Sequence, residues 1–250
     1  MRDNNISSGY FANFINLKRQ QIEGAERAIL NGELAGHQLD IAKYRNFEKS
    51  LQLVVATYSA GWKFDQIKRE YDRTIVLFKE GWVGDVVKFK KGKPKKIYDQ
   101  YQLNEYCYFV WLVSLNILLM KGKYDSLFLE VVNRHNISDE LILRLVHRDD
   151  IGKRLLTPTT YKPFATLQQK NTPLHSLTEK QLISYLNSWY KGTKLLTWHR
   201  YIESIDNTYY FGYWSFEAAA VALIAGLNDN DNFKSPYFPN ELFSYSIKNI

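Results

Sequence analysis

Cysteine is almost absent from this chain of 250 residues, which contains Cys107 alone. One thiol cannot form an internal disulfide, and it excludes a zinc site built from several cysteines. Cys107 lies between Tyr106 and Tyr108 in a strongly apolar stretch, where a thiol is ordinarily inert packing rather than a nucleophile. The sequence therefore gives little support to a cysteine hydrolase.

Patterns for metal and phosphate chemistry are also missing. The segments GKYDS and GKPKK lack the paired glycines that a phosphate-binding loop needs. No two histidines lie one helical turn apart, so none forms a local ligand pair; the five are His37, His135, His147, His175 and His199. We expect no metal ion and no cofactor, and no group of residues supports an enzyme.

Long hydrophobic runs are absent as well. The longest apolar run without charge, Tyr106 to Met120, is shorter than the ~18–20 residues that span a bilayer. It is typical of a buried helix. The first residues, MRDNNISSGYFANF, show no basic segment followed by an apolar one, so no secretory signal is expected. These features predict a cytoplasmic protein that does not enter a membrane.

The net charge of +7 has a local origin. The first 124 residues carry 20 Lys+Arg against 13 Asp+Glu, whereas the remainder carries 13 of each. Six lysines lie within residues 88–96 alone. Such a loop could grip phosphates, with Phe89 and Tyr98 beside it for stacking, or it could be a solubilising surface loop. Nucleic-acid binding is therefore retained as an alternative function.

Apolar residues recur at spacings of three and four along most of the chain, which predicts an all-α fold. Convincing strand-like alternation is found nowhere. The expected helices cover residues 7–31, 38–60, 64–81, 98–120, 125–133, 138–148, 179–190, 194–205 and 214–225.

We expect two packed halves of antiparallel helices. Lys121-Gly122-Lys123 ends the long fourth helix and marks the boundary between an N-terminal domain, residues 1–122, and a C-terminal domain, residues 123–250. Three other segments are predicted to be non-helical or loosely held. They are the connector at residues 81–94, the irregular stretch 149–173 with three prolines, and the tail after Pro239.

The stretch from Tyr209 to Gly226 organises the rest of the chain. The helix that follows Gly212 and Tyr213 is apolar nearly all round, as expected of a helix in the middle of a fold. Glu217 is its one charged residue, and a buried carboxylate needs a cationic or hydroxyl partner because an unpaired buried charge is very costly. The candidates are Lys191, His199, Arg200 and the nearby tyrosines.

The same region carries a family resemblance. The sequence WYKG at residues 189–192, Trp198, YFGYWSFEAAAVA at 210–222 and PYFP at 236–239 resemble the C-terminal half of the PoNi family. These are bacterial immunity proteins that are paired with polymorphic nuclease toxins. A looser resemblance runs through Tyr10-Phe11, Lys43-Tyr44 and residues 56–61. The motif residues that we interpret as structural are Trp189, Tyr190, Gly212, Tyr213, Trp214 and Glu217. Anchors for a binding partner at the mouth of a groove are the alternative interpretation of the four aromatic ones.

The resemblance implies a protein that binds a cognate DNase toxin and blocks its DNA-binding or active-site face. A nuclease must hold a polyanion, so that face should be basic and should attract acidic residues on its inhibitor. We therefore expect toxin contacts from the neutral C-terminal half, at Asp149, Asp150, Glu203, Asp206, Asp229 and Asp231. Solvated turn residues are the alternative explanation for these carboxylates.

Overall fold

The computed structural model describes residues 1–148, 159, 161–167, 172–203, 209–228 and 233–249. The chain forms two compact units, and each contains two separate stretches of sequence. Unit 1 comprises Met1–Val87 and Arg200–Gly212, and unit 2 comprises Lys88–His199 and Tyr213–Ile250. This division differs from the expected boundary between residues 122 and 123, since the long apolar helix belongs with the C-terminal elements.

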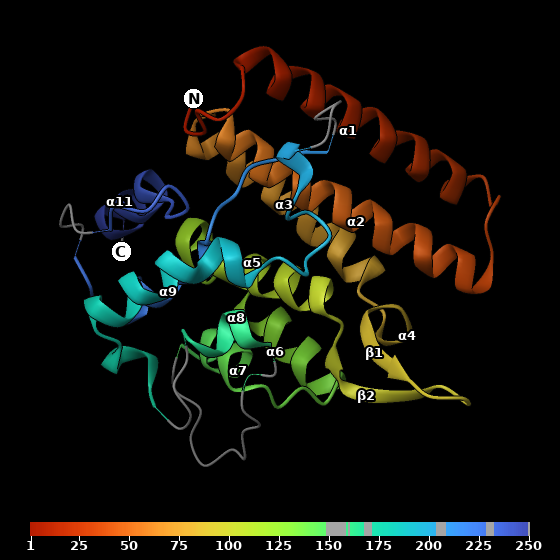
Figure 1. Ribbon diagram of the computed structural model, residues 1–250. Helices are drawn as coiled ribbons and strands as arrows, with labels where there is room; N and C mark the ends of the chain where they lie inside the picture. The colour runs from red at the N-terminus through yellow and green to blue at the C-terminus, as the bar shows by residue number, and fades with distance from the viewer. Residues whose placement is uncertain (149–158, 160, 168–171, 204–208, 229–232, 250) are drawn as a thin grey trace. The chain divides into compact units, whose positions relative to one another are not determined.

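Unit 1 is built from three long helices, which Figure 1 shows in red to orange, followed by one short helix. They are α1 (Ser8–Leu30), α2 (Gly36–Ser59), α3 (Phe64–Gly81) and α4 (Gly84–Val87). The Ser7 side chain accepts a hydrogen bond from the Tyr10 backbone N–H, so α1 begins where the sequence predicts. The predicted bounds of α3 are confirmed in full.

An aromatic cluster holds α2 against the end of α3. Phe47 packs edge-on against both Phe78 and Trp82, with ring centroids 5.5 and 5.4 Å apart. Gly81 permits this approach, because a Cβ at that position would lie 2.6 Å from the Lys43 carbonyl oxygen. A larger residue at position 81 would therefore force the two helices apart.

Tyr210 and Phe211 are held in unit 1 by specific hydrogen bonds. The Tyr210 hydroxyl donates to Asp3 at 2.5 Å, and the Tyr10 hydroxyl donates to the Tyr210 carbonyl at 2.7 Å. The buried Ser59 hydroxyl donates to the Phe211 carbonyl at 2.9 Å. A segment that is remote in sequence thus completes the N-terminal helical unit.

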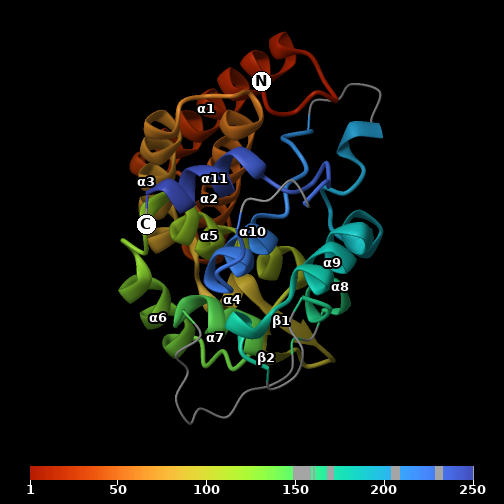
Figure 2. The same ribbon diagram turned by 90° about the vertical axis from the view of Figure 1, so that its left-hand side faces the viewer.

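Unit 2 is arranged around α5 (Leu103–Met120), which packs against α10 (Phe216–Ile224), α11 (Asn240–Lys248) and α7 (Glu140–Val146). Figure 2 shows α10 and α11 in blue. Among the described residues, α5 alone is long and apolar enough to cross a membrane by length and composition, and it is largely buried within the protein. The other elements are β1 (Lys88–Lys91), β2 (Lys96–Tyr101), α6 (Asp125–Arg134), α8 (Lys162–Ala165), η1 (Leu174–Ser176) and α9 (Glu179–Gly192). The short helix η2 (Tyr201–Glu203) belongs to unit 1.

The mostly helical class is confirmed, and four local predictions are wrong. The long helix expected from residue 98 begins at Leu103, because Lys96–Tyr101 form β2. The lysine-rich connector contains the antiparallel hairpin β1–β2 instead of a loop, and the Phe89 and Tyr98 rings pack against each other across its strands. The helix expected at residues 194–205 is absent from the part that the structure describes, where turns lead to η2. The tail after Pro239 forms α11, which is anchored because Leu242 and Phe243 are fully buried.

Candidate functional site

Glu217 lies in the first turn of α10, and its side chain is closed to solvent. Its Oε1 accepts hydrogen bonds from the Tyr185 hydroxyl at 2.7 Å, Trp189 Nε1 at 2.6 Å and the Ser215 hydroxyl at 2.7 Å. Its Oε2 accepts one from Trp111 Nε1 at 3.0 Å. The prediction of a buried carboxylate with a hydroxyl partner is confirmed. Each of these four donors is neutral, unlike the cations considered from the sequence.

Burial dominates the electrostatics of this network. It raises the pKa of the Glu217 carboxyl, while hydrogen bonds from Ser215, Tyr185 and Trp189 act in the opposite direction. Burial, followed by the charge of Glu217, also raises the pKa of the Cys107 thiol, which favours the inert form. With no access from solvent, Glu217 serves to link α5, α9 and α10 rather than to act on a ligand.

Trp198 of the motif lies between two of the tryptophans that donate to this carboxylate, Trp189 and Trp111. The Trp198 ring lies 5.6 Å from Trp189 in a stacked arrangement and 5.2 Å from Trp111. Close by, the Tyr213 hydroxyl donates to the His199 carbonyl at 2.7 Å. These side chains are buried, so their role is that of scaffold.

The remaining motif residues also have structural environments. The half-buried ring of Tyr190 stacks on Tyr237 with centroids 5.5 Å apart, and the Trp214 side chain is buried. Gly212 has a φ of 113°, a conformation that residues with a Cβ rarely adopt. The sequence motif therefore encodes a buried network and a backbone turn.

The structure describes only one of the six acidic residues that we predicted as toxin contacts. Glu203, in η2, is exposed and belongs to unit 1. The other five predicted contacts lie outside the described residues: Asp149, Asp150, Asp206, Asp229 and Asp231. The structure therefore places one of the six carboxylates and leaves their proposed association as a hypothesis.

Among the described residues, Lys88 is the one lysine of the hairpin that forms an ion pair, and the other five differ in their exposure. The Lys88 amine donates to Asp99 at 2.5 Å and to the His135 carbonyl at 3.1 Å. This ion pair, together with a hydrogen bond from Asn136, lowers the pKa of the Asp99 carboxyl. The other five lie at the strands and their turn: Lys90, which is half-buried, and Lys91, Lys93, Lys95 and Lys96, which are exposed.

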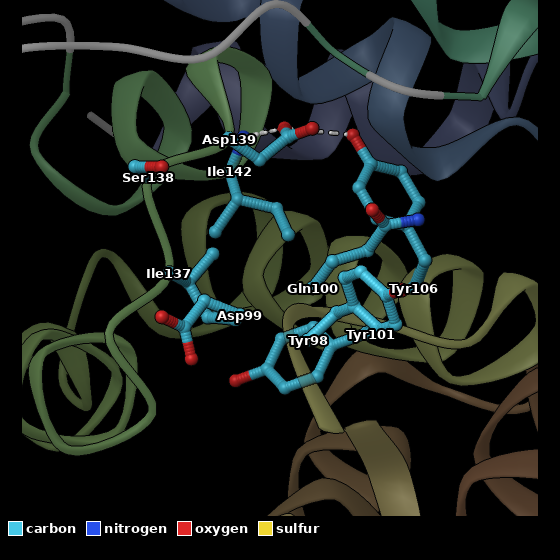
Figure 3. A pocket seen from close by; sticks show the side chains of 9 residues that line it. All are labelled: Tyr98, Asp99, Gln100, Tyr101, Tyr106, Ile137, Ser138, Asp139 and Ile142. Atoms are coloured by element: carbon cyan, nitrogen blue, oxygen red, sulfur yellow. Dashed lines mark hydrogen bonds between the residues drawn. The ribbon is translucent and has the colours of Figure 1, made fainter. Parts of the chain in front are cut away.

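A pocket of about 240 Å³ opens at the base of the hairpin (Figure 3). Three tyrosines line it, and within it the Tyr106 hydroxyl donates to Asp139 at 2.9 Å. Asp139 also caps α7 by accepting from the Ile142 N–H at 3.2 Å. Asp99 lines the opposite side, where Lys88 partly compensates its charge. The pocket offers aromatic faces and carboxylates to a partner, yet both carboxylates already have structural roles.

Sequence reasoning missed this pocket because its walls come from three separate stretches. Tyr98 and Asp99 belong to β2, Tyr106 to α5, and Asp139 to the start of α7. The only local signal was the N-cap sequence at residues 138–140. Across the described part of the chain, no three His, Cys, Asp or Glu side chains gather so that they could hold a metal ion.

Two family models match the chain. One, for the PoNe immunity protein (PoNi) N-terminal region, matches residues 2–128, and the other, for the C-terminal region, matches residues 136–242. The chain belongs to the PoNi family. PoNi proteins are immunity proteins rather than enzymes, and an immunity protein has a toxin as its partner.

A comparison with solved structures found a protein with a similar fold. The crystal structure of protein PA2201 from Pseudomonas aeruginosa aligns with 99% of this PoNi chain and 91% of its own, with a TM-score of 0.68. The two sequences are 16% identical, so the similarity shows a shared fold alone. No match was found among curated proteins.

Proposed function

We propose that this PoNi protein binds and neutralises a cognate DNase toxin in the bacterial cytoplasm. The observation that carries the proposal is the match of both PoNi regions, which together span residues 2–128 and 136–242. Binding would block the DNA-binding or active-site face of the toxin.

The acidic residues are our proposed contacts with that face. A DNA-binding surface is basic, so carboxylates on the inhibitor increase the association rate and favour the correct orientation. Glu203 is exposed and accessible to such a partner. The proposal extends to the aspartates at positions 149, 150, 206, 229 and 231, which the sequence places in turns.

Co-expression tests this function directly. Cells would express the toxin encoded beside the gene for this protein, with or without the protein itself, and survival would be scored. Purified components would then be tested for co-purification and for inhibition of DNA cleavage. We expect survival, a stable complex and lost cleavage. A folded protein that neither binds nor protects against an active toxin would overturn the proposal.

The lysine-rich hairpin supports an alternative function, which is binding of nucleic acid. The hairpin carries four exposed lysines, the half-buried Lys90 and the Phe89–Tyr98 ring pair, whose centroids are 5.5 Å apart. Lysines attract phosphates, but the amine of Lys96 already lies over the Tyr98 ring at 5.4 Å. Tight oligonucleotide binding that resists physiological salt would favour this alternative.

A further inference from the structure

Unit 2 carries a groove of about 560 Å³ that the family motif does not explain. The C-terminal end of α9 and the turn that follows it form one wall, and α8 forms part of the other. Aliphatic side chains and one aromatic ring supply its apolar lining: Leu103, Leu195, Leu196 and Tyr161. We call it the α8–α9 groove.

Short-range contacts fix the walls of the α8–α9 groove. The Tyr161 hydroxyl donates to the Tyr101 carbonyl at 2.6 Å, and the Asn104 side chain accepts from the Thr197 N–H at 2.9 Å. Leu196 is buried and anchors the turn, whereas the next side chain back, Leu195, is 75% exposed. The turn is therefore held rigidly while presenting an apolar side chain to solvent, as a preformed contact does.

Among the described residues, the charged side chains that line the α8–α9 groove are all lysines. Lys162, Lys191 and Lys194 line it and are exposed, and none of them pairs with an acidic side chain in the described part of the chain. No described acidic residue contributes to the lining. An apolar floor edged by three exposed ammonium groups complements a partner that is both apolar and negatively charged.

We propose that the α8–α9 groove binds an acidic amphipathic segment of the cognate toxin. Aliphatic side chains of that segment cover Leu195 and the groove floor, and its carboxylates pair with the three lysines. This inference rests on the proposed immunity function and deepens it, because it specifies the chemistry of one toxin contact. Since the DNA-binding face of a nuclease is basic, the acidic segment lies outside that face.

The lining favours a protein segment over the other anionic partners. A single-stranded nucleic acid needs free aromatic faces for its bases, and the groove offers one ring, Tyr161, whose hydroxyl is held by Tyr101. A small acidic ligand is usually enclosed by its site. Here Leu195 extends into solvent at the edge of the groove, and only a larger partner would cover it.

The test compares two double charge reversals in the full-length protein. Lys191→Glu with Lys194→Glu alters the groove, and Lys93→Glu with Lys95→Glu makes the same charge change on the hairpin. All four lysines are exposed, so both variants should melt as the wild type does. Affinity for the toxin encoded beside the gene would be measured by calorimetry at several salt concentrations.

We expect the groove variant to bind at least about tenfold more weakly and to show a flatter dependence of affinity on salt, because attractive charge contacts become repulsive. The hairpin variant should bind within about threefold of the wild type, and Lys191→Arg with Lys194→Arg should retain affinity. Leu195→Ser should weaken binding without changing the salt dependence.

Two results would overturn the inference separately from the proposed function. If the wild type binds the toxin and both double reversals bind equally well, the groove is not a contact while the immunity function stands. If the groove variant keeps its affinity for toxin but loses binding to a labelled oligonucleotide, the site takes nucleic acid. A wild-type protein that does not bind the toxin would overturn both proposals.

Discussion

The indole nitrogen of Trp189 lies 2.6 Å from Oε1 of Glu217, 28 positions along the chain. The Tyr185 hydroxyl, one turn earlier in α9, donates to the same oxygen at 2.7 Å. Trp111 donates to Oε2 from α5, so the carboxylate of α10 ties together the central helices of unit 2. The family motif therefore fills the core of unit 2 and links its helices through hydrogen bonds to one carboxylate.

Removing this carboxylate should destabilise the fold. Glu217→Ala leaves buried donors on Tyr185, Trp189 and Trp111 without an acceptor, and we expect a loss of about 2–4 kcal/mol in the free energy of unfolding. Thermal or urea denaturation measures it. Glu217→Gln is the matched control, since it keeps the size and one acceptor oxygen and should lose less. An unchanged melting temperature for Glu217→Ala would contradict the structural role.

The sequence made Glu217 predictable but left its partners open. A charged residue on a helix that is apolar on every side had to be buried and hydrogen-bonded. Three of its donors could not be chosen in advance, because Trp111 of α5 meets Tyr185 and Trp189 of α9 only after the chain has folded. Helix ends followed from local signals, such as Ser7 before α1 and Thr178 before α9.

Two failures show where local patterns were insufficient. Lysine is a poor strand former, so the lysine-rich sequence did not predict a hairpin. The contact between the Phe89 and Tyr98 rings across its strands is a feature of the folded structure. The α8–α9 groove had no sequence signature, because Leu103 and Lys162, which line it, are remote in sequence from residues 191–196. The acidic contacts stay a prediction, as five of the six lie outside the described residues.

Helix α11 should contribute to stability rather than behave as a loose tail. Phe243 is fully buried and packs edge-on against Phe238, with centroids 5.3 Å apart. Phe243→Ala should lower the free energy of unfolding by about 3–5 kcal/mol, because it leaves a cavity in the core. Urea denaturation of this variant and of Lys248→Ala, which alters an exposed side chain of the same helix, provides the comparison. Equal stability of the two variants would show that α11 is dispensable.

Acidification should weaken unit 2 through His135. Burial, followed by the positive charges of Arg134 and Lys88, lowers the pKa of His135 to about 4, below the usual value near 6.5. Between these two values the unfolded chain binds a proton that the folded protein does not, so stability falls as the pH falls from about 6.5 towards 4. His135→Gln cannot titrate and should lose less stability over this range.

The measurement is the melting temperature at half-unit steps of pH for both proteins. Neutral Tyr101 contacts the His135 ring, its hydroxyl lying 3.2 Å from Nδ1, and this contact does not offset the repulsion from the two cations. Parallel curves for the wild type and His135→Gln would show that the acid sensitivity originates elsewhere.

The hairpin should bind nucleic acid only weakly. Lys88 is occupied by Asp99, so at most five lysines remain for phosphates. If all five were used, log affinity would fall with log salt at a slope of about −4.5, taking about −0.9 per neutralised phosphate. We expect binding of a single-stranded oligonucleotide at low salt and its loss at physiological salt, measured by fluorescence anisotropy. Glutamine replacements of the five lysines should abolish even the low-salt binding.

Charge reversal tests the proposed acidic contact surface. A basic nuclease face would be repelled by lysines placed where aspartates attract it, so Asp149→Lys with Asp150→Lys, and separately Asp229→Lys with Asp231→Lys, should reduce protection. Glu203→Lys should act in the same direction if this exposed residue shares the surface. Each variant is first checked for an unchanged melting temperature and then scored for survival and for inhibition of DNA cleavage.

Because the groove reversal changes lysine to glutamate, the two sets of variants move the net charge in opposite directions. A response to total charge alone would therefore improve one set while impairing the other. Impairment by both sets would instead indicate two local contacts of opposite sign. If the folded aspartate variants protect as well as the wild type while neutralising the hairpin lysines abolishes protection, the toxin binds elsewhere and the acidic surface proposal is wrong.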